Sequence, residues 1–257
     1  MNWTKDGFLD GKLTIKQPEK GFRAGSDAVL LAAAIDMKPS QSVLDVGCGV
    51  GTAGLCLKYR IPAAKMWGLE IQAELAETAR QNAADNSFAQ DVTILNTDIC
   101  NRKGFDGLEG PSGRSFLNDG FDHVLSNPPF YAEGRAQASP SSVKSVAHIE
   151  GEADLAFWIS FCLARVKPKG TLTLIHRSDR LPEILHEMGK GCGSLKIIPL
   201  WPNVQTPAKR VLLQGIKSDK GPTLLHPGIV LHEKDGRPTE ISEKILRDGV
   251  SLTSFLN

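Results

Sequence analysis

The sequence feature that most constrains the fold is a glycine-rich turn between an apolar run and a helical stretch. Residues 42–46 form a short apolar run of the kind that makes a buried strand, and Gly47, Gly49 and Gly51 follow it at once. Residues 51–60 then have a helical pattern. Glycines reach positive φ angles and let a ligand approach the backbone closely, and the start of a helix adds unpaired N–H groups. The segment therefore predicts a strand–turn–helix unit with a ligand at the turn.

Apolar runs and helical stretches alternate along the rest of the chain. This alternation is typical of an α/β protein with a parallel sheet flanked by helices, and the last two apolar runs predict a closing hairpin. Asp179 is a candidate N-cap of the last helix. We expect strands at 66–71, 92–96, 123–126, 171–175, 196–200 and 211–216, and helices at 73–86, 155–166 and 179–188.

Two segments break the alternation. Residues 101–119 are rich in glycine and residues 131–146 in serine and alanine, and neither has a clear period. Long irregular loops in a compact domain are often lids or mobile segments, although a simple insertion explains the first equally well. No linker divides two cores, so we expect one domain over residues 1–257, with residues 1–36 as an extension packed on it.

Acidic residues stand at the ends of three successive predicted strands, namely Asp45, Glu70 and Asp98. In open parallel sheets the ligand lies at this carboxyl edge. An acid beside the glycine turn repels a polyphosphate but suits a ligand with an ammonium and a sulfonium. Glu70 can bind ribose hydroxyls, and Asp98 can accept a hydrogen bond from an adenine amine. Together with the three glycines, Ile71, Ile99 and Asn127, these acids predict a site for an adenosine-containing cofactor.

A second interpretation of the turn stays open at this point. Residues 49–54, Gly-Val-Gly-Thr-Ala-Gly, also match the G-x-G-x-x-G fingerprint of dinucleotide-binding proteins. Glu70 serves a nicotinamide dinucleotide as well as it serves another adenosine cofactor.

The strongest chemical signal is the strip Ser-Asn-Pro-Pro-Phe at residues 126–130, directly after the fourth predicted strand. Asn-Pro pairs mark turns, but residues before prolines are also held extended, and prolines have no N–H. The strip thus offers carbonyl acceptors, from the Asn127 side chain and the Pro128 backbone, to the two N–H groups of a planar amine. Phe130 can stack on the ring that carries this amine. The three residues are the predicted catalytic group.

Composition excludes several other classes of site. The five cysteines are scattered and form no C-x-x-C pair, which argues against a disulfide framework and a zinc site, and we expect no metal. No apolar run approaches the ~18 residues of a membrane span. The polar N-terminus lacks the core of a signal peptide, so we expect a cytoplasmic protein. The net charge is +1, so any RNA contact must come from a local patch, for which residues 165–180 and 209–220 are the basic candidates.

The glycine turn and the Asn-Pro-Pro-Phe strip together resemble the class I S-adenosylmethionine-dependent methyltransferases that modify planar amines. Within that group the chain is similar to the bacterial tRNA(Val) adenine-N6 methyltransferases. The likeness extends to the segment 21–31, Gly-Phe-Arg-Ala-Gly-Ser-Asp-Ala-Val-Leu-Leu, and to the tail 209–215, Lys-Arg-Val-Leu-Leu-Gln-Gly. Some relatives carry Tyr in place of Phe130, and either ring stacks.

The resemblance implies a doubly wound, mostly parallel seven-stranded sheet with an antiparallel last strand. It implies S-adenosyl-L-methionine as cofactor and a tRNA adenine beside the anticodon as target. It also implies that Arg23, Ser26 and Asp27 lie over the methionine end of the cofactor, a role compatible with Ser26 or Asp27 capping the helix that follows. An rRNA guanine N2 or a protein glutamine amide remains the alternative target, because methyltransferases of both use a similar strip.

Overall fold

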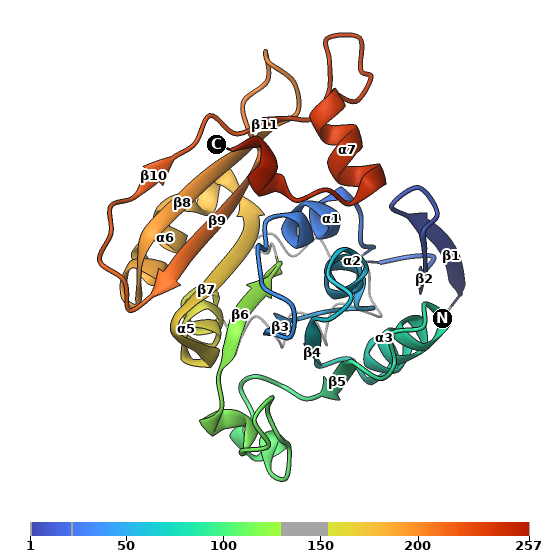
Figure 1. Cartoon of the computed structure of the whole chain (residues 1–257), viewed down its shortest axis with the longest axis vertical. Coiled ribbons are helices and arrows are strands. Elements are labelled where there is room, and N and C mark those ends of the chain that lie inside the picture. Colours follow the sequence, from blue (N-terminus) through green and yellow to red (C-terminus); the bar gives the residue numbers. More distant parts are fainter. Residues whose placement is uncertain (1, 22, 130–153, 257) are drawn as a thin grey trace, which may run out of the picture.

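The computed structural model describes residues 2–21, 23–129 and 154–256. Its centre is one sheet in the order β10-β8-β9-β7-β6-β3-β4-β5, with β11 also paired to β8 (Figure 1). The strands are β3 (Ser42–Val46), β4 (Lys65–Glu70), β5 (Val92–Asn96), β6 (Phe121–Ser126), β7 (Val166–Arg177), β8 (Cys192–Trp201), β9 (Arg210–Lys217), β10 (Leu224–Leu225) and β11 (Ile229–Val230).

The sheet is mostly parallel, as the sequence predicts. Strands β5, β4, β3, β6 and β7 are parallel, and β9 lies antiparallel between β7 and β8. The chain winds outward from β3 in both directions, so the carboxyl ends of β3 and β6 meet at the switch point where ligands of such sheets bind. The predicted doubly wound sheet and closing hairpin are confirmed. The expected count of seven strands is wrong, because the two-residue strands β10 and β11 pair with the outer edge of β8 and make nine.

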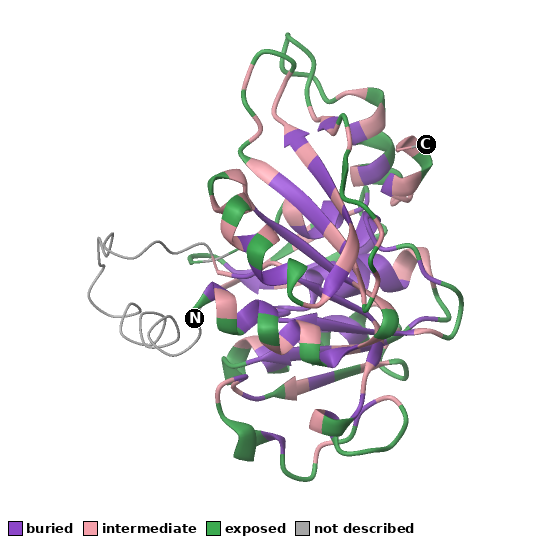
Figure 2. Ribbon diagram, turned by 90° about the vertical axis from the view of Figure 1, so that its left-hand side faces the viewer, coloured by how far each residue is buried: buried purple, intermediate pink, exposed green. Residues whose placement is uncertain are grey.

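Helices cover both faces of this sheet (Figure 1). Successive residues of β3 point to opposite faces, so Val43 packs in a core with α1, α2 and α7, while Leu44 packs in a core with α5 and α6. The central strands are therefore buried on both sides (Figure 2). The helices are α1 (Ser26–Ala33), α2 (Thr52–Arg60), α3 (Ala73–Asp85), α5 (Leu155–Arg165), α6 (Leu181–Gly189) and α7 (Glu240–Asp248).

An N-terminal hairpin of β1 (Trp3–Phe8) and β2 (Leu13–Pro18) packs beside α3. Asn82 of α3 joins it to the glycine turn. This fully buried side chain accepts from the Lys16 N–H at 2.8 Å and donates to the Lys16 and Val50 carbonyls at 2.9 Å each. One amide thus holds three chain segments in register beside the future ligand site.

The segment 101–119 has a core of its own. Its two short 3₁₀ helices, Arg102–Phe105 and Phe116–Asn118, bring Phe105 and Phe116 into a stack with ring centroids 5.2 Å apart. Both rings are buried with Phe121. The segment is therefore a packed part of the domain, and the second irregular segment, 131–146, lies outside the described residues.

Local details differ from the sequence-based expectations at three helix ends. The N-cap of α1 is Gly25, with no side-chain cap, so neither Ser26 nor Asp27 caps it. The N-cap of α6 is Arg180, and Asp179 instead forms an ion pair with Arg177. Helix α5 ends at Arg165, and β7 begins immediately at Val166, because the chain pairs with β6 through a register shift before Thr171.

We expect Asn82→Ala to lower the free energy of unfolding by about 2–3 kcal/mol, because the buried side chain loses three hydrogen bonds at once. Urea unfolding of the purified protein measures this. Asn86→Ala is the matched control, since Asn86 makes three similar bonds to Thr14 and Asn82 nearer the solvent. Equal losses in the two variants would contradict the role given to Asn82.

Candidate active site

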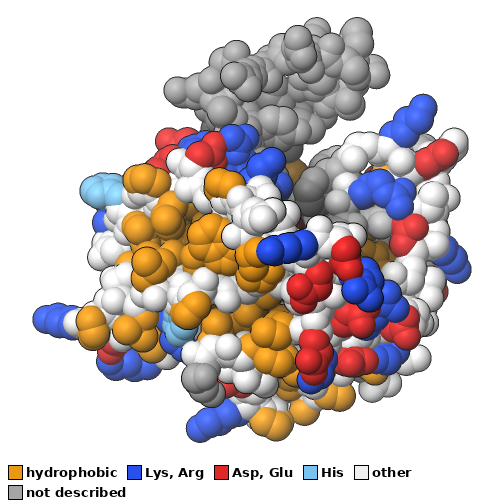
Figure 3. All heavy atoms as spheres, turned by 90° about the horizontal axis from the view of Figure 1, so that it is seen from above, with side chains coloured by type: hydrophobic (Ala, Val, Ile, Leu, Met, Phe, Trp, Pro, Cys, Tyr) orange, Lys and Arg blue, Asp and Glu red, His pale blue; other side chains and the backbone are white. Residues whose placement is uncertain are grey.

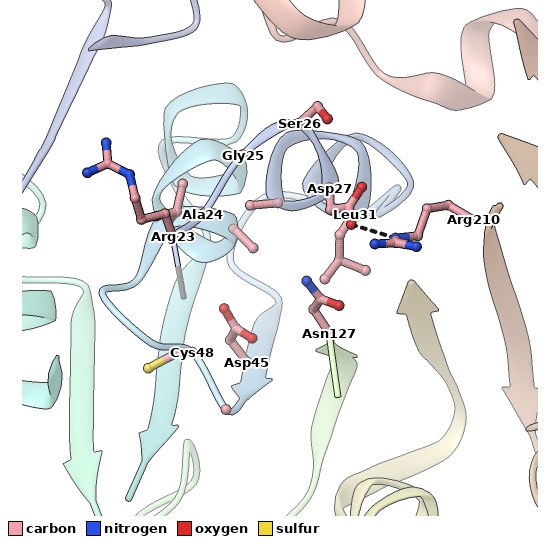
Figure 4. A pocket seen from close by; sticks show the side chains of 14 residues that line it. Arg23, Ala24, Gly25, Ser26, Asp27, Leu31, Asp45, Cys48, Asn127 and Arg210 are labelled. Atoms are coloured by element: carbon pink, nitrogen blue, oxygen red, sulfur yellow. Dashed lines mark hydrogen bonds and ion pairs between the residues drawn. The ribbon is translucent and has the colours of Figure 1, made fainter. Parts of the chain in front are cut away.

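A cavity of about 410 Å³ opens at the carboxyl ends of β3 and β6, below the first turn of α1 (Figure 4). Its walls come from the segment before α1, the glycine turn, the first turn of α2, the end of β6 and the start of β9. This volume lies in the range of roughly 300–1,000 Å³ that small-molecule sites occupy. The residues that line it are Arg23, Ala24, Gly25, Ser26, Asp27, Ala28, Leu31, Asp45, Gly47, Cys48, Thr52, Ala53, Asn127 and Arg210.

The turn after β3 can be made only with glycine at two places. Gly47 has a φ of +73°, and a Cβ on it would lie 2.8 Å from the ring of Trp158. Gly49 has a φ of +56° and nothing within 4 Å of its Cβ position, which leaves room for a ligand against the backbone. Gly47 lines the cavity, whereas Gly49 and Gly51 shape the turn without lining it.

Asp45 is one of two acidic side chains that line the cavity, the other being Asp27 (Figure 4). It is 3% exposed, and its Oδ2 has no hydrogen-bond partner among the described residues. Burial raises the pKa of Asp45 to about 7; a backbone hydrogen bond from Gly54 opposes this rise, and the nearby Glu70 adds to it. Because a buried carboxylate with one unsatisfied oxygen and no opposite charge beside it is costly, this position fits a ligand that brings positive charge.

Glu70 and Asp98 lie at the same sheet edge but not on the cavity wall. The Oε2 of Glu70 accepts the Gly49 N–H at 2.9 Å and its Oε1 accepts the Gln72 N–H at 2.8 Å, so the carboxylate braces the glycine turn. Burial raises the pKa of Glu70, while these backbone bonds lower it. Asp98 Oδ1 accepts the Cys100 N–H at 2.8 Å. Of the hydrophobic neighbours, Ile71 is 37% exposed and Ile99 is buried. The cofactor contacts expected of these four residues stay predictions.

Asn127 lines the same cavity as Asp45, and Figure 4 shows its amide directed into it, towards α1. Its Oδ1 is buried and has no hydrogen-bond partner within the described parts of the chain. Pro128, the next residue, is buried and has no N–H. Phe130 lies outside the described residues. The two described members of the predicted catalytic strip are therefore at the cavity or adjoin it.

Trp158 of α5 connects the strip to the glycine turn, and sequence reasoning missed it. Its indole N–H donates to Ser126 Oγ at 2.9 Å, and that hydroxyl donates to the Val46 carbonyl at 2.6 Å. The same indole packs against Gly47. In the sequence Trp158 is one more apolar residue of a predicted helix, so only a tertiary contact could have revealed its position.

The segment before α1 forms one wall, with side chains that point in different directions. Arg23 turns away from Asp45 and binds the hairpin, with Nη2 2.7 Å from Asp6 Oδ2 and Nη1 2.9 Å from the Pro18 carbonyl (Figure 4). Ser26 also points away in this view. Asp27 faces Asn127 and accepts from Arg210 Nε at 3.0 Å. The predicted contacts of Arg23 and Ser26 with a cofactor stay predictions, and backbone atoms of this wall reach the cavity in any case.

The cysteines agree with the sequence analysis: all five are free thiols. No group of three or more metal-binding side chains was found in residues 2–21, 23–129 and 154–256. Over the same residues, no helix combines the length and the apolar character that crossing a membrane requires.

The chain is similar to known methyltransferases. Residues 20–145 match the family model described as methyltransferase small domain. A Porphyromonas gingivalis protein named tRNA1(Val) (adenine(37)-N6)-methyltransferase is 33% identical over 183 residues, which are 70% of this chain and 68% of that protein. A Vibrio campbellii protein of the same name is 21% identical over 238 residues, 92% of each chain. A release factor glutamine methyltransferase of Chlorobaculum tepidum is 29% identical over 127 residues, 49% of this chain and 40% of that protein.

Solved structures give the same fold. A predicted O-methyltransferase of Agrobacterium tumefaciens superposes with a TM-score of 0.68 and 25% identity, over 87% of this chain and 96% of that one. A methyltransferase of Pyrococcus furiosus has a TM-score of 0.55 and 16% identity, over 80% and 90% of the two chains, and is alike in fold alone. The class I methyltransferase fold expected from the sequence is confirmed.

The raised pKa of Asp45 predicts that the stability of the protein depends on pH. Its folded pKa of about 7 lies above the unfolded value of ~3.9, so the folded state binds more protons between these values. The contribution of Asp45 to stability therefore falls as the pH rises from about 4 to about 7 and then levels off. The loss attributable to this group is at most about 4 kcal/mol.

Asp45→Asn removes this titration and keeps the side-chain shape. Urea unfolding of both proteins from pH 4 to pH 8 should show the stability of the wild type falling relative to the variant. Parallel pH profiles would show that Asp45 does not titrate in this window.

Proposed function

The chain belongs to the family of bacterial tRNA(Val) adenine-N6 methyltransferases, and on this premise we propose that it methylates N6 of the tRNA(Val) adenine beside the anticodon, using S-adenosyl-L-methionine. One observation in the structure supports the proposal most directly. Among the described residues, Oδ1 of Asn127 and Oδ2 of Asp45 are buried without a hydrogen-bond partner, and both side chains line the same cavity. One acceptor suits an amine substrate, and the other suits a cationic cofactor.

The residues of the cavity fit this cofactor. Oδ2 of Asp45 is a negatively charged acceptor without a partner among the described residues, and the backbone at Gly49 leaves space near the positive end of α2. Glu70 and Asp98 at the neighbouring strand ends are the proposed partners of the ribose hydroxyls and the adenine amine. Bound S-adenosylmethionine supplies an electrophilic methyl group on a sulfonium leaving group. The protein therefore has to provide binding and orientation rather than a strong nucleophile.

The target amine needs help because its lone pair is delocalised into the adenine ring. The side-chain oxygen of Asn127 and the carbonyl of Pro128 can each accept one of its two N–H bonds. This holds the nitrogen at the methyl group and favours a pyramidal geometry with a localised lone pair. Proline contributes no N–H that would compete for these acceptors. We assign Phe130 the role of a stacking surface for the base, which must be flipped out of its loop to enter.

The alternatives have less support. Glutamine amides and guanine N2 amines can use the same two acceptors, and the Chlorobaculum glutamine methyltransferase is a relative over half of this chain. The tRNA-modifying relative from Vibrio campbellii, in contrast, is similar over 92% of it, and that from Porphyromonas gingivalis over 70%. The nicotinamide interpretation of the glycine turn leaves Asn127 and Pro128 without a function and is set aside with the family assignment.

The proposal is tested with cofactor that carries a labelled methyl group. The protein is incubated with unmodified tRNA(Val) transcript, ribosomal RNA or a release factor, and the products are digested and separated. We expect label as N6-methyladenosine from the tRNA. Label found only as N2-methylguanosine or in protein would replace the proposed substrate with one of the alternatives.

Asn127→Ala should lower kcat by about 10²-fold or more, in the range seen when one such polar contact to a reacting group is removed. Cofactor affinity should stay nearly the same, because the lost oxygen faces the amine. Single-turnover rates and titration with S-adenosylhomocysteine separate the two quantities. Asn86→Ala, on the surface of the domain, is the control. An equal loss of affinity and turnover in Asn127→Ala would assign Asn127 to cofactor binding or to structure instead.

A further inference from the structure

Binding of RNA by this chain depends on small clusters of charge. The net charge is only +1. Figure 3 shows apolar side chains over one half of the face that it presents, and intermingled acidic and basic side chains over the other. Nucleic-acid affinity nevertheless comes largely from Lys and Arg side chains at phosphates. RNA affinity must therefore depend on where the fold places the two basic runs of the sequence, 165–180 and 209–220.

The fold divides both runs into two groups. The runs occupy β7 and β9, which are antiparallel neighbours from Thr171 opposite Ile216 to Arg177 opposite Arg210. The regularly paired part of β7, from Thr171 to Arg177, spans roughly 20 Å. One group is thus at the amino end of β7, far from the cavity. The other is at its carboxyl end, next to Asn127 and consisting of Arg177, Arg180, Lys209 and Arg210.

The distant group serves the structure. Arg165 is buried and donates to the Phe116 carbonyl, and Lys217 donates to the Leu163 carbonyl at 2.5 Å. Lys167 is 3.0 Å from Asp122 Oδ2, and Lys169 is 2.9 Å from Asp219 Oδ1. These contacts join helix α5, β6 and the loop after β9, and they lie away from the site.

The group at the cavity is arranged differently. Arg210 lines the cavity on the side of Asn127 away from the glycine turn (Figure 4). Arg177 is its cross-strand neighbour. Burial lowers the pKa of His176 to about 4, and the charges of Arg180 and Arg210 contribute, so both guanidinium groups lie near this one ring. Lys209 is exposed, with no acidic partner in the described parts of the chain.

Three arginines of this group form ion pairs with acidic residues, but these pairs leave the arginines able to bind a phosphate as well. Asp179, Glu183 and Asp27 pair with Arg177, Arg180 and Arg210, with side chains 27–54% exposed. Pairs with this exposure are weak, and a guanidinium has five N–H donors, so it can hold a carboxylate with one edge and a phosphate with another.

We propose that Arg177, Arg180, Lys209 and Arg210 form a phosphate-binding rim that holds the RNA backbone beside the flipped adenine. An adenine whose amine reaches Asn127 and Pro128 has its ribose and phosphates at the mouth of the cavity, where this rim begins. The inference rests on the proposed function, since it deepens the same site by naming the surface that receives the RNA.

The test compares two double variants that each lose two positive charges. Arg177→Ala/Lys209→Ala removes two exposed members of the rim, and Lys169→Ala/Lys220→Ala removes two exposed cations from the distant end. The affinity for unmodified tRNA(Val) transcript is measured at several salt concentrations. We expect the rim variant to bind about tenfold more weakly and its salt slope to fall by about 1.5, as for two lost phosphate contacts. The distant variant should match the wild type. Affinity for S-adenosylhomocysteine should be unchanged in both, which verifies that they are folded.

The outcomes separate the rim from the proposed function. If the wild type methylates the transcript but the rim variant keeps wild-type affinity and salt slope, the rim is overturned and the function stands. A loss of equal size in the distant variant also overturns the rim, because it means that total charge and not position controls binding. If the wild type binds S-adenosylhomocysteine but neither binds nor methylates the transcript, the proposed function itself fails.

Discussion

The parallel pairing of β3 with β6 is the constraint on which the site depends. It sets Val46 beside Ser126, and the hydroxyl of Ser126 closes the pair by donating to the Val46 carbonyl. The residues on either side of this point, Asp45 and Asn127, then face one cavity although they are far apart in the chain. Trp158 supports the arrangement from below, since it donates to Ser126 and packs on Gly47. The glycine turn after β3 and the Asn-Pro strip after β6 are thus held together as one unit.

The same unit contains buried polar groups that lower the stability of the folded chain. The Asp45 carboxylate is buried without a partner for one oxygen, and Asn127 has a buried acceptor in the same condition among the described residues. Polar groups in this state destabilise a folded chain unless a ligand satisfies them. Asp45 and Asn127 line the same cavity, which agrees with a site that binds a ligand at the expense of stability.

Arginines around the cavity illustrate how position changes the role of a residue. The family resemblance of the segment 21–31 implies Arg23 as a ligand contact; Arg23 lines the cavity, and its guanidinium binds Asp6 and the Pro18 carbonyl of the hairpin. Arg210, which in the sequence is one residue of a basic tail, lines the cavity and pairs with Asp27. The hairpin and β9 come from opposite ends of the chain, so neither assignment follows from local pattern.

The sequence by itself determined the class of fold, because apolar periodicity and glycine turns act over a few residues and need no knowledge of distant contacts. It also determined the chemistry of the strand ends, where Asp45 follows from the glycine turn and Asn127 from the proline strip. The tertiary structure alone decided which of these groups share a cavity, that Glu70 braces the turn, that Trp158 connects the two motifs, and how the basic runs divide between the ends of β7. The physical reason is that such contacts join residues through strand pairing and packing across the sheet, and these depend on the whole chain being folded.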